Sequence, residues 1–527
     1  MSFVINFSKS ATLLASLAVT GCLLSSASAQ AKELTLLYVP LDNRPVCIDY
    51  VQQTMEAAGC KIILPPAKYI ATNNKNGDPD GLWAWLATKA PKADAAVIST
   101  DSLLYGGLVA SRTHHLSREQ LSTRLERLHE LKTTLPIKLY AFTTIMRTPR
   151  ASRGRVEPPY YAQLGPDIFA YSELIDEQEQ RRLTPVKQSR LAELEAKLPK
   201  AELSDWLGRR ELNHQINIKL TQMARNGKFH YLAIGKDDNA PLSATHMEAR
   251  KLSMATFEMP AEQLQLLDGV DQLGLLLLVR AYNEMNDLKP SIYPLYSPGI
   301  GAGTLPQYSD SRLQDSVPAQ IKAVGAKLVP TPASADLVLA LNTPPDGEVK
   351  DSTAGDNQYF ASLANKQFVT TLKEHLRTGR NVSLADISYA NGADNGFMNL
   401  LAQGDALSRL AAYNGWNTAD NSVGFAIAQG LMAKYMTSAE RERLVKQRLI
   451  DDWFYQSNAR SIVADELDKH NREEMKYELE GATKPVLAFV TDKCQSLAQS
   501  YQFTKNTQFK LSLPWNRLFE VDVDIKK

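Results

Sequence analysis

Cysteine residues and an excess of one charge, which mark several specialised protein classes, are scarce or missing in this sequence. It contains only 4 cysteines in 527 residues, and no Cys-x-x-Cys pair is present. This argues against a disulfide-stabilised miniprotein, a zinc knuckle and a thioredoxin-like redox site. Neither positive nor negative charge is in excess, because the sequence has 59 Lys and Arg residues and 58 Asp and Glu residues. Without a basic field, we expect no binding to nucleic acid.

A long apolar run is found at the N-terminus. Residues 11–24 are largely apolar, and the small residues 27–29 precede a glutamine. This pattern is typical of a secretory signal peptide over residues 1–29, and the run is too short to span a bilayer comfortably. Residues 19–22 also resemble a bacterial lipobox, which would leave a lipid anchor on Cys22. We therefore expect an exported protein, periplasmic or extracellular, with no transmembrane segment.

Short apolar runs alternate with helical patterns along most of the remaining chain. The strand candidate Leu275–Ala281, for example, begins with the run Leu275–Val279, which is apolar without alternation, as in a strand that is covered on both faces. This alternation of strand and helix predicts an α/β fold with a mostly parallel sheet. About ten strands are expected, and a barrel of this type needs eight. We favour a (β/α)8-like barrel with extra strands over two doubly wound halves that meet near residue 270.

The same patterns suggest a division of the chain. The α/β core is expected over residues 30–436, and it carries a long insertion at residues 148–228. From residue 437 the pattern changes to charged helices. We expect residues 437–527 to form a C-terminal helical appendage that docks on the core. No internal repeat is evident in the sequence.

Polar side chains recur directly after the strand candidates. In parallel α/β folds, ligands bind outside the carboxyl ends of the strands. Asp and Asn also cap helices, but six such endings at one rim would form a polar pocket. Acids, amides, an arginine and aromatic rings suit the hydroxyls and C–H faces of a sugar. The substrate-binding residues that we expect are Asp42, Asn43, Arg44, Asp101, Tyr105, Arg147, Asn239, Asp386, Asn391, Asn414, Trp416 and Asn417, with Tyr105 and Trp416 as stacking platforms.

The adjacent acids Asp237 and Asp238 are the candidate catalytic residues. Two neighbouring carboxylates repel each other, which raises one pKa and lets one group stay protonated beside a charged partner. Hydrolysis of a glycosidic bond requires this division of roles. The sequence therefore predicts a glycoside hydrolase that acts on a glycan or amino-sugar fragment without a metal or cofactor. The alternative is structural, with one of the two acids capping a helix near Ser243.

Two other functions remain open. A non-catalytic protein with two lobes that close on a ligand would use the same residues for binding alone. A metal-dependent hydrolase would draw its ligands from a set of acids and one histidine, and its activity would be lost with chelator. That set consists of Asp42, Asp101, Asp237, Asp238 and His246.

Several segments together resemble a bacterial family. They are Val39–Pro45, Ser99–Gly107, Gly235–Pro241, Ala412–Asn421 and Leu513–Arg517. On these segments the mature chain is similar to proteins grouped as domain of unknown function 4127. The resemblance implies no activity, so it transfers no functional residues.

A second resemblance concerns two short segments. Lys236–Asp238 and Trp416–Asn421 are similar to the Asp-Asp and Trp/Asn-rich segments of barrel β-N-acetylglucosaminidases. We use this similarity as an analogy for the chemistry.

Overall fold

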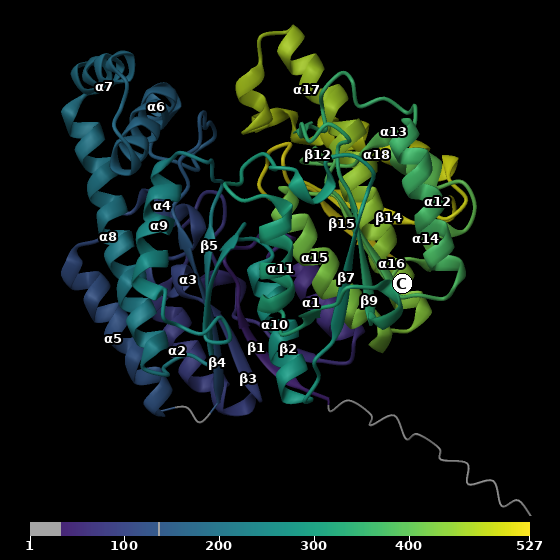
Figure 1. Ribbon diagram of the computed structural model, residues 1–527, viewed down its shortest axis with the longest axis horizontal. Coiled ribbons are helices and arrows are strands. Elements are labelled where there is room, and N and C mark those ends of the chain that lie inside the picture. Colours follow the sequence, from purple (N-terminus) through teal and green to yellow (C-terminus); the bar gives the residue numbers. More distant parts are fainter. Residues whose placement is uncertain (1–32, 135–136, 527) are drawn as a thin grey trace, which may run out of the picture. The chain divides into compact units, whose positions relative to one another are not determined.

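A computed structural model describes residues 33–134 and 137–526. The segment expected to be a signal peptide, residues 1–29 with Cys22, lies outside the described residues. The described chain is of the α/β class, with two main sheets whose strands are all parallel (Figure 1).

The first sheet has six strands in the order β2-β1-β3-β4-β5-β6. All of its neighbouring pairs are parallel. Its inner strands read as continuous apolar runs because helices cover both faces. The bounds are β1 Thr35–Val39, β2 Lys61–Ile63, β3 Ala95–Ser99, β4 Lys138–Ile145, β5 Tyr231–Lys236 and β6 Leu264–Asp268.

The second sheet has five strands in the order β13-β11-β9-β7-β8, again all parallel. Its bounds are β7 Ser291–Tyr296, β8 Lys327–Leu328, β9 Leu337–Asn342, β11 Val382–Asp386 and β13 Ala412–Asn414. Both sheets therefore wind in the same way, with the first strand between the second and the third. The two halves repeat a strand order and not a sequence, which agrees with the absence of an evident internal repeat in the sequence.

The expected barrel is wrong, because both sheets are open and the chain forms two doubly wound halves. The run Leu275–Ala281, expected as a strand, lies inside helix α10, Leu273–Met285. Helix α10 packs on the first sheet and on α15, Ala419–Met432, which covers the second sheet. The first half of this helix, Leu273–Val279, is apolar and buried on all sides, and a short run of this kind does not distinguish a helix from a buried strand.

Strands β6 and β7 are absent from the strands that the sequence predicts. In β7, Pro294 argues against predicting a central strand, because proline cannot donate a backbone hydrogen bond to a neighbouring strand and is usually confined to edge strands. Strand β8 pairs with β7 only at Ser291 and Ile292. Beyond Ile292 one side of β7 is therefore free of that partner, and Pro294 is accommodated in a strand that is central in the order of the sheet.

Helices surround the two sheets and also form the segment 148–228. The helices of the first half are α1 Asp49–Ala57, α2 Pro79–Lys89, α3 Thr100–Leu104, α4 Leu108–Thr113, α5 Arg118–Thr134 and α9 Ala244–Thr256. The segment 148–228 contains α6 Tyr161–Gln180, α7 Pro185–Lys197 and α8 Lys200–Arg225. Those of the second half are α11 Leu313–Ala323, α12 Leu363–Arg377, α13 Asn395–Leu401 and α14 Ala406–Arg409. Short strands β10, Lys350–Asp351, and β12, Tyr389–Ala390, pair beside the second sheet.

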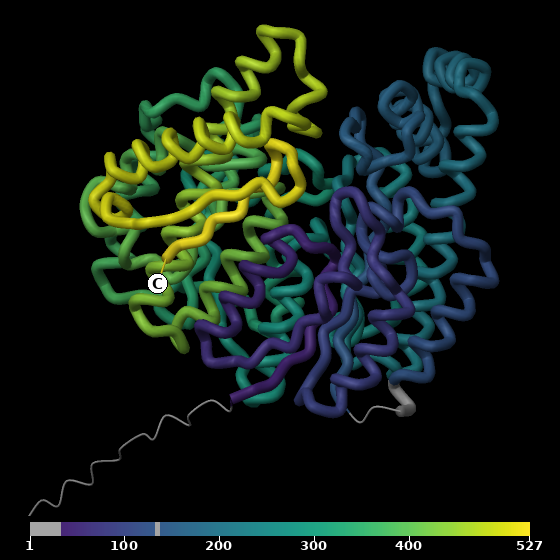
Figure 2. Tube along the Cα trace, turned by 180° about the vertical axis from the view of Figure 1, so that it is seen from behind, coloured from purple at the N-terminus to yellow at the C-terminus, as the bar shows by residue number. Residues whose placement is uncertain are grey.

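The C-terminal segment shares its core with the second half. Trp453 and Phe454 of the π-helix η6, Leu449–Ala459, pack in one apolar cluster with Leu384 of β11 and Val523. Figure 2 shows the yellow C-terminal trace lying along the green second half. The elements of this segment are α16 Ser438–Arg448, η6, α17 Arg460–Lys469, α18 Thr483–Ser500 and the hairpin β14 Phe509–Ser512 with β15 Asp522–Ile525. Among the described helices, none combines the length and the apolar character needed to cross a bilayer.

Candidate functional site

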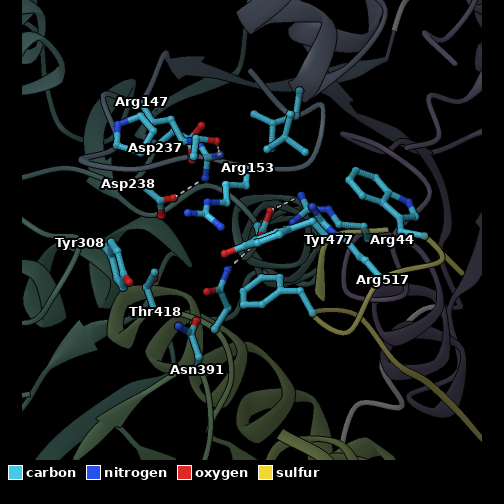
Figure 3. Close-up of a pocket in the computed structure, with 18 of the residues that line it drawn as sticks. Arg44, Arg147, Arg153, Asp237, Asp238, Tyr308, Asn391, Thr418, Tyr477 and Arg517 are labelled. Carbon is cyan, nitrogen blue, oxygen red and sulfur yellow. Dashed lines mark hydrogen bonds and ion pairs between the residues drawn. The ribbon is translucent and has the colours of Figure 1, made fainter. Parts of the chain in front are cut away.

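A cavity of about 440 Å³ lies where the carboxyl ends of both sheets meet (Figure 3). Its walls come from segments that follow the strands, as expected for doubly wound sheets. The C-terminal segment completes the wall with Tyr477, Trp515, Arg517 and Phe519. In strand order, the lining includes Arg44 after β1, Arg112 after β3, Arg147 after β4, Asp238 after β5, Asp271 after β6, Tyr308 after β7, Asp351 after β9, Asn391 after β11 and Asn417 after β13.

Asp237 and Asp238 line the cavity in different environments. Asp237 is buried and accepts two hydrogen bonds from Arg112, at 3.1 Å from Nε and 2.5 Å from Nη2. Asp238 has 23% of its side chain exposed and accepts one bond, at 2.7 Å, from Nη1 of Arg147. Burial raises the pKa of Asp237 to about 6 against the opposing charge of Arg112, and the negative charge of Asp238 adds to the rise. The two neighbours are therefore electrostatically distinct.

Neither of these acids caps the following helix. Ser243 is the N-cap of α9, and its Oγ accepts a hydrogen bond of 3.0 Å from the backbone N–H of His246. The side chain of Asn239 closes the turn before α9, because its Oδ1 accepts bonds from Ala240 N at 2.8 Å and from Ser243 Oγ at 2.9 Å. Neither Asp237 nor Asp238 is therefore the helix cap that the structural alternative requires.

Arg44 joins the first and last strand ends of the first sheet. Its guanidinium binds Asp42, with Nε at 3.0 Å from Oδ1, and Asp271, with Nη2 at 2.6 Å from Oδ1. Asn43 holds the C-terminal segment, because its Oδ1 accepts a 2.7 Å bond from Nε1 of Trp515. The ring of Trp515 lies 5.5 Å from the Arg44 guanidinium. Residues far apart in sequence therefore build this wall together.

The structure brings six of the predicted site residues together and places the others elsewhere. Trp416 is only 3% exposed and packs on Phe519 at 5.3 Å, and Tyr105 is buried against His114 at 4.9 Å. Neither ring is thus available as a stacking platform in this cavity. The lining includes Arg44, Arg147, Asp237, Asp238, Asn391 and Asn417. The predicted residues that do not line it are Asp42, Asn43, Asp101, Tyr105, Asn239, Asp386, Asn414 and Trp416.

The buried polar residues among these hold the fold near the cavity. Asp386 accepts a 2.8 Å bond from Asn342 and a 3.0 Å bond from the backbone N–H of Asp394. Asp42 fixes Arg44. Asp386 is the last residue of β11 and Asp42 follows β1, as the sequence indicates, but their side chains bond to neighbouring protein groups and do not line the cavity. A strand-end position alone does not decide whether a side chain faces the ligand or a loop.

The sequence reasoning missed the residues that the second half and the C-terminus contribute. Asp271 and Tyr308 follow β6 and β7, which are not among the predicted strands. Trp515 and Arg517 lie in Leu513–Arg517, one of the segments that resemble the family, and this resemblance could have pointed to them. No local pattern marks Asp351 or Arg460 as a site residue. These side chains come together only through the packing of the two halves.

Two segments meet over one side of the cavity. Arg153 Nη1 lies 2.9 Å from Glu473 and 3.1 Å from Glu474, and Arg155 pairs with Glu478 at 3.2 Å. Between them Gly154 adopts φ +79° against Tyr477. The loop 148–157 of the first half is thereby tied to residues 473–478 of the C-terminal segment.

Gly154→Ala should loosen this tie. Its new Cβ would lie 2.7 Å from Cβ of Tyr477, and the left-handed φ adds about 1–2 kcal/mol of strain. Gly227→Ala is the matched control, because Gly227 has φ +69° with nothing within 4 Å of an added Cβ. We expect trypsin to cleave after Arg153 or Arg155 several-fold faster in Gly154→Ala and unchanged in Gly227→Ala. Equal cleavage rates in the two variants would show that the contact with Tyr477 does not hold the loop.

Asp101 carries a buried carboxyl close to the Asp-Asp pair. It lies beside Thr144, without a hydrogen bond of normal geometry to either of its oxygens. Burial raises its pKa to about 7, and the charge of Asp237 adds to the rise. Between about pH 4 and pH 7 the unfolded chain therefore releases this proton while the folded protein keeps it. Asp101 consequently contributes stability at low pH that is lost as the pH rises through 7.

Asp101→Asn should remove this pH dependence. The amide does not titrate, so the variant avoids the ionised buried carboxyl at pH 8 and resembles the wild type near pH 4. We expect the free energy of unfolding of the variant, relative to wild type, to rise by on the order of 1–3 kcal/mol from pH 4 to pH 8. Urea unfolding at the two pH values measures the difference. A pH-independent difference would mean that Asp101 titrates normally in the folded protein.

The residues weighed for a metal do not form one cluster. His246 binds Asp176 at 2.6 Å, away from the Asp-Asp pair. Over residues 33–134 and 137–526, no group of three or more His, Cys, Asp or Glu side chains has an arrangement that could hold a metal ion. Cys47, Cys60 and Cys494 are free and buried.

Comparison with known families places the whole described fold in one group. The family described as protein of unknown function (DUF4127) matches residues 36–524. The chain belongs to this family. No curated protein and no solved structure shows significant similarity to it. The DUF4127 match spans both sheets and the C-terminal hairpin, so the cavity lies entirely within the family domain.

Proposed function

We propose that this DUF4127 protein is a carbohydrate-active hydrolase that cleaves a glycosidic bond in the cavity between its two sheets. The observation that carries the proposal is the pair Asp237 and Asp238, two adjacent carboxyls in unequal environments on the wall of a polar cavity. Pairs of acids whose surroundings separate their pKa values are the usual acid/base assignments of such enzymes.

The two acids have different tasks in this proposal. Asp238 reaches the cavity and donates a proton to the glycosidic oxygen. Asp237 lies behind it, held by two bonds from Arg112, and burial raises its pKa. Because the groups are adjacent, the proton belongs to the pair. Arg147 orients Asp238 through its 2.7 Å bond.

The lining suits a polyhydroxylated ligand. Carboxylates, amides and guanidinium groups are all present in the lining, and Asn391 and Asn417 add amide donors and acceptors to the donors of Arg44. Tyr308 and Tyr477 supply ring faces in place of Tyr105 and Trp416. Sugar hydroxyls bind to paired donors and acceptors of this kind, so a glycan or amino-sugar fragment is the proposed substrate class.

A non-catalytic binding protein is the second candidate. The architecture favours it, because two separate sheets contribute to one cavity and are connected through helix α10. Ligands of two-lobed proteins bind between the lobes in this manner. In either case we propose that residues 1–29 direct export, which N-terminal analysis of the protein recovered from its cell envelope would test.

A hydrolysis screen distinguishes the two candidates. Residues 30–527 would be assayed on chromogenic glycosides and cell-wall fragments, with and without EDTA. We expect EDTA-resistant release of one sugar. Chelator-sensitive release would replace the paired-carboxylate mechanism by a metal-dependent one. No release, together with an increase of the melting temperature by a sugar, would establish the binding protein instead.

A further inference from the structure

The wall opposite the Asp-Asp pair contains a buried acceptor without a partner. Asn391 is 7% exposed and lines the cavity, yet its Oδ1 has no hydrogen-bond donor among the described residues. Its Nδ2 is used, donating a 2.7 Å bond to Oδ2 of Asp351. A buried amide oxygen without a donor is costly in a folded protein. A ligand hydroxyl or amide in the cavity would satisfy it.

Asp351 is the carboxylate of this wall. It belongs to β10 in the second half, lines the cavity and has 37% of its side chain exposed. Besides the bond from Asn391, its Oδ1 accepts a 3.0 Å bond from the backbone N–H and a 2.7 Å bond from the hydroxyl of Thr353. The guanidinium of Arg460 lies 3.7 Å away. The carboxylate is thus held in place while one side remains open to the cavity.

Tyr308 connects the two walls. Its backbone carbonyl accepts a 2.9 Å bond from the N–H of Asn239, the residue after Asp238. Burial raises the pKa of the Tyr308 phenol to about 12, and the charges of Asp238 and Asp351 both add to the rise. Asp238, Tyr308 and Asp351 all line the same cavity. Figure 3 shows Asp238 and Asn391 on opposite sides of the open space, with Tyr308 beside it.

We propose that Asp351 is the second catalytic carboxylate of the site and that it faces Asp238 across the bound sugar. This assignment rests on the proposed hydrolase function. It places a catalytic carboxylate in the second half as well as in the first, so that the site is complete only when both walls contact the substrate. It also gives Asn391 a ligand group to bind.

The reaction then balances with water as the co-reactant. Asp238 in its acid form gives a proton to the glycosidic oxygen, the bond from that oxygen to the anomeric carbon breaks, and the alcohol leaves. The positive charge left on the sugar ring is stabilised by the Asp351 carboxylate. Water adds to the anomeric carbon and its proton returns to Asp238. One glycoside and one water yield two products, and both acids regain their initial states.

The surroundings of Asp351 fit this role. Burial opposes its ionisation, but Arg460 and the bonds from Asn391 and Thr353 outweigh burial and hold its pKa below the ordinary value. A group that stabilises positive charge must remain ionised throughout the working pH range. Asp237 on the other wall has a raised pKa. The two walls therefore carry carboxyls of opposite tendency, with the pKa lowered at Asp351 and raised at Asp237.

Asp351→Asn tests the assignment on a glycoside that the wild type cleaves. We expect kcat to fall about 10²–10³-fold, with KM changed far less. Asp346→Asn is the matched control, because Asp346 is an exposed acid in the same segment whose Oδ1 accepts only a local 3.0 Å bond from Glu348 N. In Asp351→Gly, added formate should restore part of the rate, which a merely structural role would not allow. Full activity of Asp351→Asn, or formate having no effect on a folded Asp351→Gly, would overturn the proposal.

The same variants separate this inference from the proposed function. If Asp238→Asn is inactive while Asp351→Asn is active, only the role of Asp351 is refuted. If the wild type cleaves no glycoside, binding of an iminosugar, whose ring carries a positive charge, is measured by calorimetry. If the wild type binds the iminosugar and the binding weakens at least tenfold in Asp351→Asn, Asp351 is supported as the carboxylate that faces the sugar ring. In that case only the hydrolase activity is refuted. No binding by the wild type would overturn both proposals.

Discussion

Asp238→Asn is expected to lower kcat on a cleaved glycoside by about 10²–10⁴-fold, the usual contribution of a general acid. The amide has no proton of suitable acidity to give to the glycosidic oxygen. It does retain an oxygen that can accept the bond from Arg147, now 2.7 Å from the carboxylate. Asn also tolerates the positive φ of 25° at this position. Steady-state kinetics and thermal unfolding together measure the effect.

The control for this variant is Asp287→Asn. Asp287 is an exposed aspartate that also has a positive φ, of 52°, in the turn after α10. It lies outside the cavity, so activity and melting temperature should both remain at the wild-type values. Asp238→Asn should match it in stability and differ in turnover. If Asp238→Asn kept more than half of the wild-type rate, Asp238 would not be the acid, and the function would be binding or another chemistry.

Arg112→Met should destabilise the protein by about 3–5 kcal/mol, the largest stability effect that we expect from a residue of the cavity wall. Methionine keeps much of the volume but removes both bonds to the buried Asp237, and it also removes the ion pair with Glu157 at 3.5 Å. Asp237 would then be a buried charge without its main partner. Urea unfolding at pH 8 measures the loss.

The pH dependence of this loss identifies its cause. The pKa of Asp237 is about 6 with Arg112 present, and removing the positive charge raises it further. At pH 5 the variant therefore holds a neutral, protonated Asp237, and the destabilisation should be smaller than at pH 8. Adding Asp237→Asn to Arg112→Met should likewise recover part of the loss. A loss below about 1 kcal/mol would mean that water replaces the guanidinium.

Arg127→Met is the comparison for this ion pair. Arg127 bonds Asp80 at the surface, where both side chains are largely exposed. Exposed pairs of this kind contribute little, about 0–1 kcal/mol. The contrast between Arg112→Met and Arg127→Met separates the effect of burial from the effect of removing an arginine.

Local sequence patterns are enough to predict the α/β class and much of the part of the site that the first half contributes. Strands such as β1, β3 and β5 are short apolar runs with polar residues directly behind them, and this local pattern does not depend on the rest of the chain. Arg44, Arg147, Asp237 and Asp238 line the cavity because the carboxyl ends of parallel strands meet at one edge of a sheet. The pair Asp237-Asp238 was recognisable from adjacency alone.

Whether the sheets close, and which side chains face the cavity, depends on contacts between elements that are distant in the sequence. Leu275–Ala281 is buried on all sides, and burial makes a helix and a strand look alike in sequence. Trp416 and Tyr105 occupy the expected strand ends, but neighbouring loops cover their rings. Asp351 and Tyr308 reach the site only because α10 and α15 bring two open sheets together. The contacts between α10 and α15 join residues more than a hundred positions apart, and no local pattern encodes them.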